Sequence, residues 1–216
     1  MNKQKTVITL AIVLGVVFAI GIVVYRSITD AEVAKLIEEQ PSVLVRASAK
    51  TRGAVDAKVH IVEFMDPGCE TCRAFHPFVE QLLADNPGKI RLSIRYLPLH
   101  EGADVMVKIL EAADKQGKYW ETLHLMFESQ PQWASHHHPQ PEKIWPLLPQ
   151  IGLDVDAIRR DMNAPEIDAI LAEDLAAARA LNIRKTPSFF VNGEPLRNFG
   201  YEPLRALVHG ALAASY

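Results

Sequence analysis

The 216-residue sequence predicts an α/β domain preceded by one transmembrane helix. Two observations lead to this fold class. An apolar run without charge covers residues 6–25. From residue 58 onward, the pattern is strand–helix–strand, then a helical block, a hairpin and a closing helix. With 49% hydrophobic residues the domain can bury a core, and a net charge of −3 gives no electrostatic reason to expect nucleic acid as a partner.

The apolar run is long enough to cross a bilayer. Residues 6–25 match the length of about 20 residues that a helix needs to span the hydrocarbon core. Because Lys3 and Lys5 precede the run and acidic residues follow it, the positive-inside rule places residues 1–5 in the cytoplasm. We expect an uncleaved, single-pass anchor in the inner membrane, with the domain on the periplasmic side. The alternative is a cleaved signal peptide, whose apolar region is typically about 7–15 residues long.

Residues 26–57 are expected to form a stalk or linker with short N-terminal elements. Thr29–Gln40 has the apolar spacing of a short helix that ends before Pro41. Ser42–Ala47 is a candidate edge strand, and the TRGAVDA segment at residues 51–57 reads as a loop.

The main domain is expected over residues 58–216. Lys58–Met65 is rich in β-branched residues and predicts a central strand, which Asp66-Pro67-Gly68 breaks. A helix with one apolar face then runs from Cys69 to about Asp85, and Lys89–Leu97 predicts a second strand.

A helical insertion at about residues 100–182 interrupts the sheet. Its helices are expected over residues 103–116, 119–128, 141–148, 155–162 and 165–181, with a polar loop over residues 129–141. The strand pair Ser188–Leu196 follows, with Asn192-Gly193 as its hairpin turn, and a helix over Glu202–Ala214 closes the domain.

Cys69 and Cys72 are the only cysteines, and their Cys-x-x-Cys spacing predicts a redox pair. Residues three apart in the first turn of a helix bring their Cα atoms to about 5–6 Å, within reach of a disulfide. Cys69 would stand at the helix start, where free N–H groups and the helix dipole stabilise a thiolate. We expect its sulfur to be exposed. Cys72 would be more buried and placed to attack a mixed disulfide on Cys69.

Two other interpretations of the cysteine pair stay open. A purely structural disulfide would close so short a loop that it removes little unfolded-state entropy. Cys-x-x-Cys is also half of a zinc site. A metal-binding or metal-delivery protein would need the His136–His138 loop to complete the ligand set, because no second cysteine pair exists. The redox interpretation needs neither a metal nor an organic cofactor, since the cysteines themselves carry the electrons.

These residues resemble a known family. Val62–Asp66 followed by Cys69-Glu70-Thr71-Cys72 resembles the first strand and active-site turn of thioredoxin-fold proteins. Pro77 matches the proline within the active-site helix, and Thr186-Pro187 resembles the family's cis-proline. The long insertion and the Gln116–Trp120 segment resemble the DsbA branch. The resemblance covers about Lys58 to the C-terminus and implies a thioredoxin-like fold with a helical insertion.

The resemblance also implies roles for single residues. Cys69 would be the attacking or attacked sulfur and Cys72 the resolving one. Thr186 and Pro187 would lie against the pair and help to hold substrate. Glu63 matches the buried acidic position that handles the proton of the second thiol, and burial would raise its pKa. The alternative is a Glu63 side chain that faces solvent.

The inner dipeptide Glu70-Thr71 departs from the Pro-His of the archetypal DsbA oxidase and the Gly-Pro of thioredoxin. Because no cation stands there, we expect a less stabilised thiolate at Cys69 and a weaker oxidant. Thr186 resembles the isomerase and reductase relatives, so the direction of electron flow stays open. His76, one turn beyond Cys72, is expected to pack against the helix rather than to tune the pair.

The expected partners follow from this chemistry. Substrates would be extracytoplasmic proteins that contain cysteines, and a membrane or periplasmic redox partner would recycle the pair.

Overall fold

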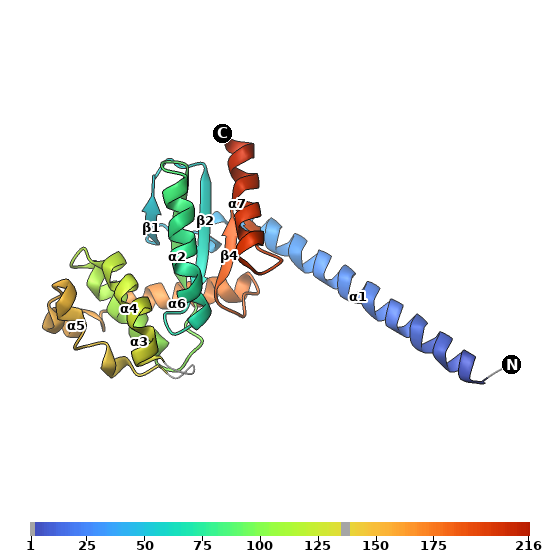
Figure 1. Ribbon diagram of the computed structural model, residues 1–216, viewed down its shortest axis with the longest axis horizontal. Helices are drawn as coiled ribbons and strands as arrows, with labels where there is room; N and C mark the ends of the chain where they lie inside the picture. The colour runs from blue at the N-terminus through green and yellow to red at the C-terminus, as the bar shows by residue number, and fades with distance from the viewer. Residues whose placement is uncertain (1–2, 135–138) are drawn as a thin grey trace. The chain divides into compact units, whose positions relative to one another are not determined.

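The computed structural model describes residues 3–134 and 139–216 (Figure 1). It forms two units, Met1–Pro41 and Ser42–Tyr216. The first unit is helix α1, Lys3–Glu39. Among the described residues this is the one helix that is long and apolar enough to cross a membrane. The short helix expected over Thr29–Gln40 is not a separate element, because α1 continues through it to Glu39.

The second unit is an α/β domain built on a five-stranded sheet in the order β1-β3-β2-β4-β5. Strand β2 lies at the centre, parallel to β3 and antiparallel to β4. All its residues except His60 are buried, which confirms the predicted central strand. The strands are β1 Lys50–Gly53, β2 Val59–Met65, β3 Ile90–Tyr96, β4 Ser188–Val191 and β5 Glu194–Pro195.

Six helices accompany this sheet in the described part of the domain. They are α2 Glu70–Asp85, α3 Ala103–Asp114, α4 Tyr119–Trp133, α5 Val155–Asp161, α6 Pro165–Ala180 and α7 Tyr201–Ser215. Short 3₁₀ turns occupy Pro41–Val43, Pro141–Lys143 and Leu148–Ile151. Helices α2 and α7 pack against each other and against the sheet, whereas α3 to α6 form the insertion between β3 and β4 (Figure 1). The predicted helical insertion is therefore confirmed.

Residues 42–57 lie in the globular unit, although the sequence suggested a stalk. Strand β1 pairs with β3 and takes in part of the expected loop. The edge strand expected over Ser42–Ala47 is absent. The reason is that the carbonyl groups of residues 42 to 44 accept hydrogen bonds from the Arg95 guanidinium, at 3.0–3.4 Å, instead of bonding to a strand.

A buried charge network ties the insertion to this N-terminal segment. Asp174 of α6 accepts hydrogen bonds from Arg46 Nη1 at 2.8 and 2.9 Å and from the Tyr96 backbone N–H at 2.8 Å. It also accepts one from Arg95 Nε. Loss of one partner of a buried ion pair typically costs about 3–5 kcal/mol, because the other charge stays buried without compensation. Asp174 thus holds the insertion, β3 and the N-terminal segment as one unit.

Helix α4 is longer than expected. The sequence suggested a polar loop from residue 129, but α4 runs on through Pro131 to Trp133. The buried Trp133 side chain donates from its indole N–H to the carbonyl of Met126 at 2.9 Å, which fixes this last turn. As a result Gln130 belongs to a helix that packs on the domain.

Candidate active site

The two cysteines lie at the junction between the central strand β2 and helix α2. Strand β2 ends at Met65, the chain turns over Asp66-Pro67-Gly68, and Cys69 occupies the N-cap position of α2. The turn is closed by a hydrogen bond from the Cys69 backbone N–H to the Asp66 carbonyl at 3.0 Å. Cys72 lies in the first turn of α2, and both cysteines are free thiols. The predicted placement at a helix start is confirmed.

The expected exposure of Cys69 is wrong. Its residue is only 7% exposed, and Cys72 is fully buried. The loop before β4 lies against Cys69, whose Sγ is 3.4 Å from the carbonyl oxygen of Thr186. The Thr186–Pro187 peptide bond is cis, as the resemblance implied. The structure therefore brings Thr186 and the redox pair together from positions 117 residues apart.

The pKa of Cys69 is lowered from its usual 9.0 to about 5. The largest cause is a hydrogen bond from the Cys72 thiol, and the Thr186 side chain and the backbone N–H groups of Cys72 and Thr71 add to it, while burial acts in the opposite direction. These donors stabilise the thiolate without any cation in the dipeptide. Glu70 lies half-buried in the first turn of α2 and Thr71 is exposed. Whether Glu70 makes the thiolate weaker than in a histidine-containing pair stays a prediction.

The pKa of Cys72 is shifted in the opposite direction. Burial raises its pKa well above the usual 9.0, and the hydrogen bond to Cys69 and the charge of Glu63 raise it further. Glu63 is itself buried at 4% exposure, so the alternative of a solvent-facing side chain is wrong. Burial raises the pKa of Glu63 to about 8, with a second contribution from the negative charge of Cys69. A thiolate, a protonated thiol and a carboxyl group are thus electrostatically linked.

Asp66 is a site residue that the sequence did not reveal. Its fully buried carboxylate accepts hydrogen bonds from the backbone N–H groups of Gly68 at 2.7 Å, Leu99 at 2.7 Å and His100 at 3.0 Å. The His100 ring nitrogen Nδ1 lies 2.6 Å from the same carboxylate. A Cβ on Gly68 would lie 2.9 Å from Pro139 Cγ and 3.3 Å from Asp66 Oδ1, so a larger residue would force these neighbours to shift. The Asp66-Pro67-Gly68 pattern indicated a turn, but nothing in it indicated the loop after β3 as its partner.

Gln130 of α4 was also missed. Its side-chain amide donates to the carbonyl oxygens of Pro67 at 2.7 Å and Cys69 at 3.1 Å. The sequence offered no signal for this contact, since Gln130 lies in a stretch of polar residues that reads as a loop.

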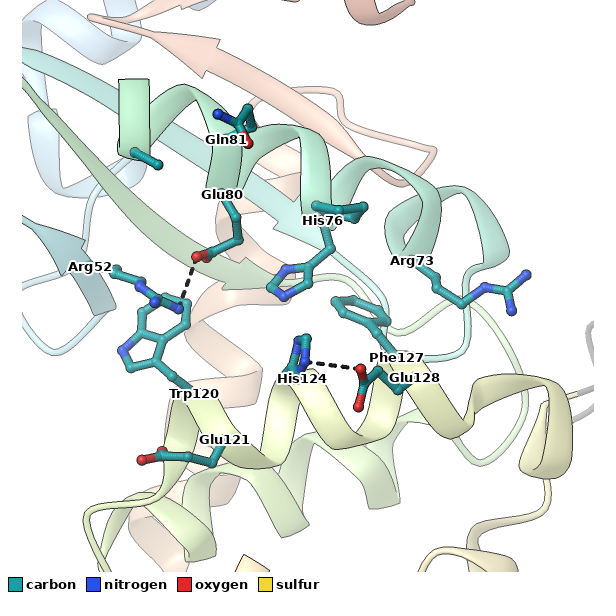
Figure 2. A pocket seen from close by; sticks show the side chains of 12 residues that line it. Arg52, Arg73, His76, Glu80, Gln81, Trp120, Glu121, His124, Phe127 and Glu128 are labelled. Carbon is teal, nitrogen blue, oxygen red and sulfur yellow. Dashed lines mark ion pairs between the residues drawn. The ribbon is translucent and has the colours of Figure 1, made fainter. Parts of the chain in front are cut away.

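A groove of about 860 Å³ lies between α2 and α4 (Figure 2). His76 of α2 and His124 of α4 extend toward one another across it, with ring centroids 6.0 Å apart, and His76 packs on Phe127 at 5.0 Å. Burial lowers the pKa of His76 to about 4, and nearby His124 and Arg52 add to the effect. His76 is therefore a neutral packing residue, in line with the expectation. Glu80 and Arg52, which also line the groove, form an ion pair of 3.0 Å (Figure 2).

The metal alternative stays untested, because it depends on the His136–His138 loop. These histidines lie outside the described residues. Across residues 3–134 and 139–216, no group of three or more histidine, cysteine, aspartate or glutamate side chains is placed to hold a metal ion.

A dithiol with one ionised and one protonated sulfur is equipped for thiol–disulfide exchange. The surrounding sheet with its helical insertion is the fold of DsbA-like solved structures. The chain belongs to the thioredoxin family, whose model, described as thioredoxin, matches residues 47–209.

Individual relatives agree with this family. The chain is 26% identical over 223 residues to the probable disulfide bond formation protein D of Bacillus anthracis, which covers 96% of this chain and 97% of the relative. The crystal structure of a thioredoxin-like oxidoreductase from Silicibacter pomeroyi DSS-3 superposes with a TM-score of 0.70 at 30% identity, covering 82% of this chain and 99% of that one.

A second group of relatives consists of longer proteins. The chain is 32% identical over 146 residues to the Na(+)/H(+) antiporter NhaA of Herminiimonas arsenicoxydans, a match that covers 68% of this chain and 22% of the antiporter. The chain therefore spans only about a quarter of the length of the antiporters that it matches.

Substitution of Cys72 tests the main cause of the thiolate. Cys72→Ala removes the hydrogen bond to the Cys69 sulfur, so the pKa of Cys69 should rise above about 5 toward its usual value. Cys72→Ser keeps a donor at the same place and should give a smaller rise. Thiolate absorbance in the ultraviolet, followed over pH on each single-cysteine protein, measures both values. Equal pKa values in the two variants would contradict the shared hydrogen bond.

Proposed function

We propose that the chain exchanges disulfides with extracytoplasmic proteins through Cys69 and Cys72. The observation that carries this proposal is the opposite shift of the two thiol pKa values within one helical turn. A thiolate is the nucleophile in such exchange, whereas a buried thiol that keeps its proton does not react until it is deprotonated in the second step. Thr186 and Pro187 would border the substrate-binding surface, because this loop lies against the Cys69 sulfur.

The exchange proceeds in two steps. In the reductive direction the Cys69 thiolate attacks one sulfur of a substrate disulfide, which forms a mixed disulfide and releases the other substrate sulfur as a thiolate. The Cys72 thiolate then attacks Cys69 Sγ and releases the first substrate sulfur. The pair loses two electrons and the substrate disulfide gains them. Oxidation of a substrate dithiol follows the same steps in reverse.

Glu63 would take the proton of Cys72 in the second step. While Cys69 is a thiolate, its charge helps to keep the Glu63 carboxyl protonated, with a pKa of about 8. Formation of the mixed disulfide removes that charge, so the pKa of Glu63 falls and the carboxylate becomes available as a base. Formation of the mixed disulfide would thereby produce the base that the second step needs to release the substrate.

We place the domain outside the cytoplasm, anchored in the inner membrane by residues 6–25. This rests on the apolar helix α1 and on the lysines that precede its apolar run. In intact cells, a maleimide that cannot cross the inner membrane should label Cys69, and the mature protein should keep its N-terminal segment by mass spectrometry. Labelling only after cell lysis would overturn the topology, and a shortened mature chain would indicate a cleaved signal peptide.

The reduction potential of the Cys69–Cys72 pair tests the proposed activity and gives its direction. We expect a reversible two-electron couple, measured by glutathione equilibration of the full-length protein in detergent micelles. A value near that of DsbA, about −120 mV, would indicate an oxidase; a value near that of thioredoxin, about −270 mV, would indicate a reductase or isomerase that needs a donor. Cys69→Ser should abolish exchange with a disulfide substrate. The absence of any reversible couple would refute the proposal.

Glu63→Gln tests the proton acceptor. Positioned acid–base catalysis typically contributes 10²–10⁴-fold, so the variant should resolve a preformed mixed disulfide about 100-fold more slowly, while attack by Cys69 changes little. Rapid-quench kinetics on both steps separates the two effects, with Glu101→Gln in an exposed loop as the control. Resolution at the wild-type rate would remove Glu63 from the mechanism.

The same variant has a pH signature in stability. The folded-state pKa of Glu63 lies above its ordinary value of 4.5, so its neutral form is the one that the fold favours. This contribution is complete below about pH 4.5 and is lost as the pH rises through about 8. The stability of Glu63→Gln relative to the natural protein should therefore increase over this range in thermal unfolding of the reduced protein.

A further inference from the structure

The turn before Cys69 contacts a polar side chain of the insertion that the two-step mechanism leaves unused. Gln130 lies in the last part of α4 and is 1% exposed. Its amide nitrogen reaches two carbonyl oxygens of the turn, Pro67 O at 2.7 Å and Cys69 O at 3.1 Å. The carbonyl of Cys69 also accepts the helical hydrogen bond from Arg73 N at 3.1 Å. Gln130 therefore bonds to the first peptide groups of the redox helix.

The orientation of this amide is fixed by its neighbours. Both contacts are carbonyl oxygens, which only accept hydrogen bonds, so the NH₂ group must face the turn. The opposite end has a cost: Gln130 Oε1 is buried and has no hydrogen-bond partner within the described part of the chain. An unpaired buried oxygen is unfavourable, and a leucine of similar size would pack here without it. The contact with the turn is the feature that a leucine would lack.

That contact bears directly on the sulfur of Cys69. The backbone N–H groups of Thr71 and Cys72 bond to this sulfur, and their direction depends on how the turn and the first turn of α2 are held. Gln130 holds the turn from the insertion, and Asp66 holds it from the loop after β3. The amide also brings partial positive charge close to Cys69, in a buried environment where such charge acts strongly.

We propose that Gln130 is a positioning residue for thiol–disulfide exchange, through which the insertion helix α4 sets the thiolate character of Cys69. The role rests on the proposed function of the cysteine pair. Gln130 does not touch the reacting sulfur; it acts through the peptide groups of Pro67 and Cys69. The insertion thereby contributes to the chemistry of the pair as well as to the surface around it.

Gln130→Leu in the full-length protein tests this role, with Gln132→Leu as the matched control because Gln132 is exposed on the same helix. In Gln130→Leu the pKa of Cys69, read from thiolate absorbance, should rise. The less stabilised thiolate disfavours the reduced form, so the equilibrium constant with glutathione should shift about tenfold, or ~30 mV in the reducing direction. Thermal stability should stay the same or increase, because the unpaired oxygen is gone. Gln132→Leu should change none of these quantities.

A structural role would give a different pattern. If Gln130→Leu lowers the melting temperature but leaves the pKa of Cys69 and the glutathione equilibrium at the control values, the proposal is overturned. If the leucine variant fails to fold, Gln130→Met serves instead: its side chain has nearly the shape of glutamine but no N–H donor, so the pKa of Cys69 should again rise. Because the pKa is read on the thiol itself, a chain without a reversible couple would refute the proposed function and still leave this measurement interpretable.

Discussion

One proton shared between two sulfurs is the constraint on which the rest of the site depends. The Cys72 thiol donates to Cys69, so the same hydrogen bond lowers the pKa of one cysteine and raises that of the other. Helix geometry makes this possible. Two side chains three positions apart lie next to each other in the first turn, and the N-terminus of the helix also presents free N–H groups. The Thr186 side chain and the backbone N–H groups of Thr71 and Cys72 strengthen this asymmetry, whereas the burial of Cys69 opposes it.

Burial disfavours ionisation of both cysteines, but it is the largest cause of the raised pKa of Cys72, where it strengthens the asymmetry. Cys69, Cys72 and Glu63 are all buried, and the cis-proline loop lies against the Cys69 sulfur. In such an environment an unbalanced charge is costly. One negative charge among the two cysteines and Glu63 therefore disfavours a second. This explains why Glu63 and Cys72 both keep their protons while Cys69 is ionised. Conversion of Cys69 to a disulfide removes the single charge and frees the next group to ionise.

Local sequence signals predicted most of the fold, and non-local contacts explain the misses. β-Branched runs, the helix start at Cys69 and the Asn192-Gly193 hairpin are local patterns, and the structure contains the elements that they predict. The segment after Pro41 looked like a strand, but Arg95, about fifty positions away, takes up its carbonyl groups. The resemblance to thioredoxin-fold proteins implied the cis-proline, and local pattern placed the cysteines. It gave Cys69 the wrong exposure, because the covering loop comes from the far end of the chain.

The two residues that the sequence missed share one physical task. A turn between a strand and a helix is ordinarily among the more mobile parts of a fold, since few contacts restrain its peptide groups. Here Asp66 satisfies N–H groups on one side of the turn and Gln130 satisfies carbonyl groups on the other. The side chains lie 64 positions apart, so no local pattern links them. With hydrogen bonds on both sides, the turn resists movement when the charge at Cys69 changes. The neighbouring ionisable groups respond to that charge, because it contributes to the raised pKa values of both Glu63 and Cys72.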